Sequence, residues 1–124
     1  MGMTTILYPE RMYPNDAEER GIFPPDATIQ MLDTRVLADL SDAECAEIDG
    51  LMVFRQWVGA ADMARMPKLR AIVRMGVGYD RIDRAAAAAR GIIVCNVPDY
   101  GTTEVADHAI ALTMALRRGL LMHH

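Results

Sequence analysis

Residues 69–107, LRAIVRMGVGYDRIDRAAAAARGIIVCNVPDYGTTEVAD, place two apolar runs on either side of an alanine-rich segment. The runs 69–75 and 91–97 are nearly continuously apolar, a pattern typical of parallel strands that are buried on both faces. Between them, five consecutive alanines follow Asp83, a residue type that caps helices, and a glycine follows as a stop signal. The stretch therefore predicts a strand, a helix over 84–90 and a second parallel strand.

The same alternation of strands and short helices continues toward the N-terminus. Three further β-rich runs that are bounded by breakers or turns are expected to be strands, at 4–9, 27–33 and 51–57. Ser41 and Glu44 have the spacing of a capping box, which predicts a helix, and a shorter helical segment ends at Pro67. We therefore predict an α/β fold, an open parallel sheet of about five strands with helices on both faces.

A longer helix of about 20 residues, roughly 30 Å in length, is expected over 103–122. Thr102 or Thr103 can cap it, and acidic residues near its amino end, Glu104 and Asp107, suit the helix dipole. Its apolar residues form two stripes, Val105, Ala109, Leu112 and Leu116 in one and Ala106, Ile110 and Met114 in the other. A helix that is apolar on two faces needs cover on two sides, so we expect a homo-oligomer that forms through this helix.

The composition narrows the classes of partner. The 124 residues suffice for one domain, and the net charge of −4 provides no basic surface for nucleic acid or for an anionic membrane. No apolar run reaches the roughly 18 residues that span a bilayer, and the N-terminus does not resemble a secretory signal, so a cytoplasmic location is expected. Cys45 and Cys95 have no metal-ligand spacing, and Cys95 is expected to be a buried strand thiol.

Arg74, Gly76, Val77 and Gly78 follow the strand predicted over 69–75. Ligands of open α/β sheets gather at the carboxyl ends of the strands. Two glycines allow the backbone to approach an anion closely, and an arginine can add a charge-assisted hydrogen bond to a carboxylate. From spacing alone, a tight turn with a surface arginine is the simpler interpretation.

Two longer motifs carry a family resemblance. IVRMGVGYDRIDRAAAAARGIIVCNVP (72–98) followed by TEVADHAIAL (103–112) resembles the NAD-dependent D-isomer-specific 2-hydroxyacid dehydrogenases. The resemblance implies a flavodoxin-like substrate domain over 1–101 that is completed by a C-terminal tail. It also implies that 102–124 form an inter-domain helix leading into a Rossmann domain, where NAD or NADP binds in the intact enzyme.

The resemblance also implies roles for individual residues. Backbone N–H groups of the loop Gly76–Gly78 bind the carboxylate of a small 2-oxo or 2-hydroxy acid. Arg74 contacts the same substrate, and Arg55, at the end of the strand predicted over 51–57, is a weaker candidate on the substrate side. The positions that border the cofactor are Val77, Thr102 and Val105.

Several family features are missing from these 124 residues. The glycine-rich GxGxxG motif and the catalytic Arg, Glu and His of the family have no counterpart, and His108 does not replace the histidine. We therefore expect no catalytic residue and no metal site in this chain, and neither dehydrogenase activity nor binding of NAD or NADP by the chain alone.

An alternative is a non-catalytic flavodoxin-like interaction module, corepressor-like or a partner of a related protein. The apolar 103–122 helix favours it. A phosphoacceptor receiver domain is excluded, because the positions that need acidic residues hold Pro9-Glu10 and Arg55-Gln56 instead.

Overall fold

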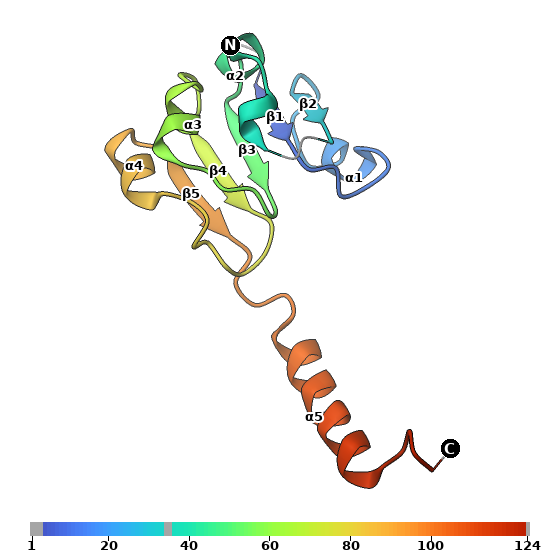
Figure 1. The fold of residues 1–124 in the computed structure, drawn as a ribbon. Coiled ribbons are helices and arrows are strands. Elements are labelled where there is room, and N and C mark those ends of the chain that lie inside the picture. Colours follow the sequence, from blue (N-terminus) through green and yellow to red (C-terminus); the bar gives the residue numbers. More distant parts are fainter. Residues whose placement is uncertain (1–3, 34–35, 124) are drawn as a thin grey trace.

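Five parallel strands form one sheet in the flavodoxin-like order β2-β1-β3-β4-β5 (Figure 1). The structure, a computed structural model, describes residues 4–33 and 36–123. The strands are β1 (Thr5–Tyr8), β2 (Thr28–Met31), β3 (Gly50–Val53), β4 (Ala71–Arg74) and β5 (Ile93–Asn96). The predicted fold class is confirmed, and the parallel pairing brings the carboxyl ends of all five strands to one edge.

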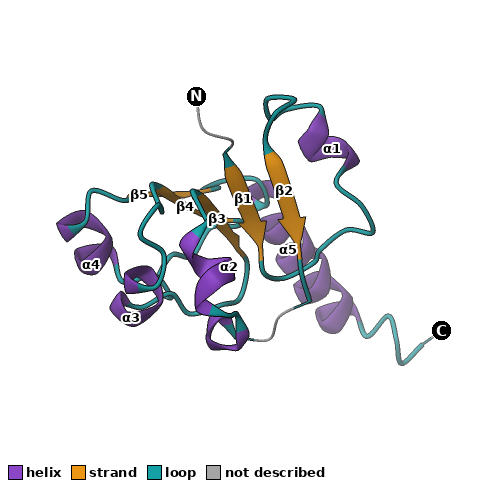
Figure 2. Cartoon of the chain, turned by 90° about the horizontal axis from the view of Figure 1, so that it is seen from above, coloured by secondary structure: helices purple, strands orange, loops and turns teal. Residues whose placement is uncertain are grey.

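The helices are short except for the last one. They are α1 (Ala17–Arg20), the 3-10 turn η1 (Leu37–Asp39), α2 (Asp42–Ala46), α3 (Ala60–Ala64), α4 (Arg84–Ala89) and α5 (Thr102–Arg118). The sequence did not indicate α1 or η1, because a single turn is too short to show a helical period. Helices α2, α3 and α4 lie together on one face of the sheet (Figure 2).

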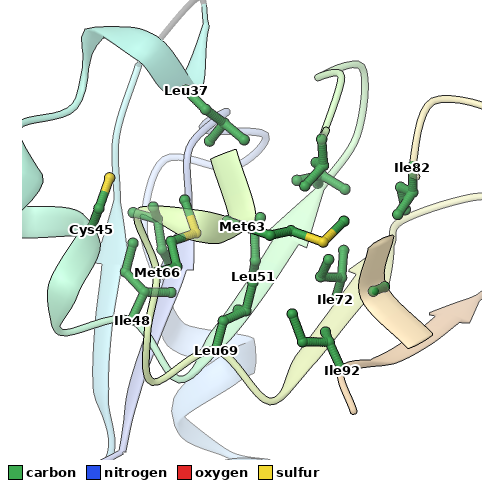
Figure 3. Packing of buried hydrophobic residues seen from close by; sticks show 14 of the residues in the cluster. Leu37, Cys45, Ile48, Leu51, Met63, Met66, Leu69, Ile72, Ile82 and Ile92 are labelled. Carbon is green, nitrogen blue, oxygen red and sulfur yellow. The ribbon is translucent and has the colours of Figure 1, made fainter. Parts of the chain in front are cut away.

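The hydrophobic core lies between these three helices and the sheet. Leu51 and Ile72 point from β3 and β4 toward Met63 and Met66, and none of the four side chains is exposed to solvent (Figure 3). Fully burying an aliphatic side chain of this size stabilises a fold by about 1.5–3 kcal/mol. The covered face therefore holds the sheet and its helices together.

The opposite face of the sheet is buried at β1, where Ile6 is 6% exposed, but open toward β5 in the described part of the chain. Ile6, Met52 and Val73 line a groove of about 350 Å³ there, and Ile93 on the edge strand is 64% exposed. Cys95 shares the face of Ile93, because side chains alternate along a strand, and it is exposed. The prediction of a buried Cys95 is therefore wrong. The apolar pattern of β5 fits burial on two faces, but no described helix covers β5 on the face of Ile93 and Cys95.

Two predicted helix starts are confirmed by side-chain hydrogen bonds. Ser41 Oγ accepts the Glu44 N–H at 3.2 Å, and the Glu44 carboxylate accepts the Ser41 N–H at 2.8 Å, which completes the capping box of α2. The bond from the Ser41 hydroxyl, followed by the bond from its backbone N–H, lowers the pKa of the Glu44 carboxyl. At the start of α4, Asp83 Oδ1 accepts the Ala86 N–H at 2.9 Å.

The third strand is shorter than the predicted run 51–57. β3 ends at Val53, and the next three residues, Phe54–Gln56, direct their backbone N–H groups to the carboxylate of Glu10. These N–H groups are then not available to the ladder of the sheet, so the chain leaves the sheet at this point.

Helix α5 points away from the sheet (Figure 1). Its N-cap is Gly101 and no side chain caps it, so the predicted capping by Thr102 or Thr103 is wrong. It ends before the predicted residue 122 because Gly119 adopts the left-handed conformation, with φ +60°. Its large apolar side chains are exposed, from 52% at Leu112 to 76% at Leu116.

Candidate functional site

Arg74 and Gly76 are packed against each other where β4 ends. Gly76 is buried and has φ +149°, a conformation that residues with a side chain disfavour. A Cβ atom at this position would overlap the guanidinium group of Arg74, which donates to the Met75 carbonyl at 3.1 Å. The glycine therefore allows Arg74 to fold back across the loop.

The Phe54 ring contacts two arginines, Arg55 and Arg74, for which the family resemblance implied a role in substrate binding. The guanidinium carbon lies 5.1 Å from the ring centroid for Arg55 and 5.2 Å for Arg74. Both distances are within the range of cation–π attraction. The structure thus brings Arg55 and Arg74 together, although they follow different strands.

A third arginine, Arg81, lies beside this pair. Its Nη1 donates to the Arg55 carbonyl at 2.6 Å, and its guanidinium carbon lies 5.6 Å from the Trp57 ring centroid. We refer to Arg55, Arg74 and Arg81 as the arginine cluster. The sequence did not indicate Arg81, because its contacts arise only when the loops after β3 and β4 meet, at the hydrogen bond from Val58 N–H to the Arg81 carbonyl.

The loop Gly76–Gly78 leaves backbone donors available. Asn96 Nδ2 donates to the Val77 carbonyl at 2.8 Å, and the Val97 N–H donates to the Gly76 carbonyl at 3.0 Å, so the carbonyl side of the loop is held. Within residues 4–33 and 36–123, the N–H groups of Val77 and Gly78 donate to no protein acceptor. Successive backbone N–H groups without a protein acceptor are able to bind an anion.

Two hollows adjoin this region. One of about 260 Å³ is lined in part by Arg55, Gln56 and Trp57, and one of about 160 Å³ is lined in part by Tyr79 and Asn96. Both are smaller than the roughly 300–1,000 Å³ of sites that enclose a drug-sized ligand. Neither hollow is therefore large enough to enclose a drug-sized ligand.

The predicted cofactor positions are not gathered into one site. Val77 lies in the loop after β4, whereas Thr102 and Val105 lie in the first turn of α5. All three side chains are exposed, and no described hydrogen bond joins Thr102 or Val105 to the loop at Val77. The three positions therefore belong to two separate elements of the chain.

The side chains with the clearest burial effects lie elsewhere. Burial, with a smaller contribution from Glu19, raises the pKa of Tyr8 to about 12, and burial raises the pKa of the Cys45 thiol. Among the residues that the structure describes, no three His, Cys, Asp or Glu side chains are grouped so that they could hold a metal ion. No helix in the same ranges is long and apolar enough to cross a membrane.

Several known dehydrogenases and reductases are similar to this chain in sequence or structure. The chain is 42% identical over 77 residues to D-3-phosphoglycerate dehydrogenase of Mycobacterium leprae, which covers 61% of this chain and 15% of the relative. NADPH-dependent glyoxylate/hydroxypyruvate reductase of Sinorhizobium meliloti, solved with NADP and malonate, has a TM-score of 0.72 and 32% identity over 92% of this chain and 34% of that protein. D-Lactate dehydrogenase of Aquifex aeolicus, solved with NAD and lactic acid, has a TM-score of 0.74 and 23% identity. The match covers 91% of this chain and 33% of that protein.

This chain therefore spans about a third or less of the length of these proteins. The family model of the D-isomer specific 2-hydroxyacid dehydrogenase catalytic domain matches residues 15–120, which is most of the chain. The match includes the whole arginine cluster and the loop Gly76–Gly78. The chain belongs to the D-isomer-specific 2-hydroxyacid dehydrogenase family.

Proposed function

We propose that this chain forms the carboxylate-binding part of the active site of an NAD(P)-dependent D-2-hydroxyacid dehydrogenase. The intact enzyme transfers hydride between a nicotinamide and a small 2-oxo or 2-hydroxy acid. The observation that carries the proposal is that the free N–H groups of Val77 and Gly78 lie in the loop that Arg74 covers. Both donors suit a carboxylate, and family membership limits the carboxylate to that of a 2-oxo or 2-hydroxy acid.

Each residue of the site has a distinct task in this proposal. Val77 and Gly78 donate backbone hydrogen bonds to the substrate carboxylate, and Arg74 adds a charge-assisted bond. Arg55 binds on the substrate side, and Gly76 permits the close approach of Arg74. Fixing the carboxylate orients the neighbouring carbon atom, where a nicotinamide bound in the intact enzyme would supply or accept hydride. We assign no catalytic residue to this chain.

Two structural units support these tasks. Residues 1–101 are the substrate domain, completed by a C-terminal tail, and residues 102–124 are the inter-domain helix. The division is supported by the end of the sheet at Asn96 and the start of α5 at Thr102. The open apolar face of the sheet is a surface that a further segment can cover.

The carboxylate proposal is tested with oxamate, a stable analogue of a 2-oxo acid, in a two-dimensional ¹H–¹⁵N NMR titration. Oxamate is expected to shift the amide signals of Val77 and Gly78. Arg74→Gln should weaken binding about tenfold, the effect of losing one charge-assisted hydrogen bond. Arg70→Gln is the control, because Arg70 lies at the other end of β4 and pairs with Asp49 at 3.4 Å. Unchanged signals at 77 and 78 in the parent chain would contradict the proposal.

We also propose that this cytoplasmic chain alone binds neither NAD nor NADP and has no dehydrogenase activity. The support is that Val77 lies in the loop after β4 and Thr102 and Val105 lie in α5, so the positions that the resemblance assigns to the cofactor are divided between two elements. A fluorescence titration of the purified chain with NADH or NADPH should give no saturable signal. Saturable binding of either nucleotide would show that these positions do form a cofactor site.

A second candidate function is that of an interaction module, and the exposed apolar side chains of α5 favour it. We propose that the segment 103–122 forms a homo-oligomer. Analytical ultracentrifugation should show a dimer or larger species, and Leu112→Glu should raise its dissociation constant at least about tenfold, because a charge then faces an apolar contact. Ala111→Glu is the control, because Ala111 lies on the face of α5 that carries Asp107 and Arg118, where an added charge does not enter an apolar contact. A monomer at every concentration would exclude association through this helix.

A further inference from the structure

The loop that follows β3 is held by one carboxylate oxygen. Glu10 Oε2 accepts the backbone N–H groups of Phe54 at 2.9 Å, Arg55 at 2.7 Å and Gln56 at 3.3 Å. Glu10 follows β1, and the loop follows the neighbouring strand β3. The carboxylate therefore ties together two chain segments that leave the same edge of the sheet.

These three hydrogen bonds fix the residues on which the arginine cluster rests. Phe54 provides the ring that the guanidinium groups of Arg55 and Arg74 contact. The Arg55 carbonyl, in the same short segment, accepts the hydrogen bond from Arg81. A change in the backbone at 54–56 would thus reach all three arginines.

The Glu10 carboxylate is bound by the backbone of the loop. Converging backbone N–H groups stabilise an anion, so the carboxylate is satisfied by the loop itself. Within the described ranges, no ion pair joins Glu10 to Arg55, Arg74 or Arg81. The three guanidinium groups are therefore not paired with Glu10, although its carboxylate lies at the same edge of the sheet.

We infer that Glu10 is a positioning residue of the carboxylate site: it holds the loop at 54–56 so that Phe54 keeps Arg74 and Arg55 where the substrate carboxylate binds. This inference rests on the proposed function, because it assigns Glu10 to the binding of the same 2-oxo acid. Glu10 acts through the loop and does not touch the substrate.

The test is an oxamate titration of the full 124-residue chain with NMR detection of the amides at 54–56 and of the Arg74 Nε–H signal. Glu10→Gln keeps the size of the side chain but replaces the carboxylate. It should weaken oxamate binding about tenfold, because a neutral amide oxygen holds the three N–H groups less strongly than a carboxylate does and the loop is then less firmly placed. The Arg74 Nε–H signal should move, because the guanidinium group shifts relative to the Phe54 ring. Glu18→Gln, a change at an exposed glutamate of α1, should alter neither measurement.

The outcomes separate the two claims. If the parent chain and Glu10→Gln bind oxamate equally, the positioning role is overturned and the proposed function stands. If Glu10→Gln weakens binding while the signals at 54–56 and of Arg74 stay in place, the positioning role is likewise overturned. If the parent chain does not bind oxamate at all, the proposed function fails, and the role of Glu10 fails with it. Should Glu10→Gln not fold, Glu10→Asp retains the charge on a shorter side chain, and the same comparison is made with it.

Discussion

Similar apolar side chains are buried in one region of the molecule and exposed in another. The first region is the sheet half, residues 4–33 and 36–96, and the second is helix α5. Leu51 in β3 is completely buried, whereas Leu116 in α5 is 76% exposed. The α-helices of the sheet half have only four to six residues, yet α2, α3 and α4 each bury one side chain in the core. Helix α5 has 17 residues and buries none.

This difference shows that the two regions draw their stability from different sources. The short helices are held by tertiary packing, since isolated helices shorter than about 12–15 residues are marginal in water. Helix α5 has only its own hydrogen bonds, its terminal charges at Arg117 and Arg118, and the glycine that ends it. The candidate site lies in the sheet half, at the carboxyl edge of the sheet. Thr102 and Val105 lie in helix α5.

The largest expected effect comes from the same substitution made in both regions. Leu51→Ala should lower the free energy of unfolding by about 3 kcal/mol, because it leaves a cavity in the core. Leu116→Ala should change it by less than about 0.5 kcal/mol at a protein concentration where the chain is monomeric. Urea unfolding followed by circular dichroism measures both. Similar losses in the two variants would show that α5 packs against the sheet in solution.

A glycine pair gives the next effect. Gly76→Ala should lower the free energy of unfolding by about 1–3 kcal/mol, because φ +149° is strained for alanine and the added Cβ overlaps Arg74. Gly101→Ala should have little effect on the same urea transition, since the nearest atom to its added Cβ is 4.0 Å away. The Arg74 displacement also predicts weaker oxamate binding for Gly76→Ala alone. If Gly76→Ala bound oxamate as tightly as the parent chain, the position of Arg74 would not matter for binding of the carboxylate.

Sequence patterns predicted the local features of both regions and missed those that depend on contacts between distant segments. The five strands, the capping box at Ser41 and the cap at Asp83 depend on neighbouring residues and were found. The prediction that Cys95 is buried was wrong. The apolar pattern of β5 shows that the strand can be buried on both faces, but it does not show which segments cover them.

The candidate site shows the same limit. Arg55 and Arg74 were marked by a family resemblance, and the structure places them on one aromatic ring. Arg81 and Glu10 carry no local signal, because their partners are 26 and at least 44 residues away along the chain. The capping of α5 by Thr102 or Thr103 failed for a local reason, since the helix starts one residue earlier than the spacing indicated and Gly101 takes the cap position.

The smallest expected effect distinguishes the helix starts of the two regions. Ser41→Ala should lower the free energy of unfolding by about 1 kcal/mol, the typical value of an N-cap, whereas Thr102→Ala should be nearly neutral because Thr102 caps nothing.

The loss of stability in Ser41→Ala should depend on pH. The two hydrogen bonds lower the pKa of Glu44 in the folded chain, so the native carboxylate binds its proton less tightly than the unfolded one. The stabilisation is therefore complete above the ordinary Glu pKa of about 4.5 and is lost as the pH falls through the lowered value. Urea unfolding of both variants between pH 7 and about 3 checks this, since the difference between Ser41→Ala and the parent chain should narrow only at the acidic end. A difference that stays constant down to that pH would show that the Ser41 hydroxyl caps the backbone without any contribution from the charge of Glu44.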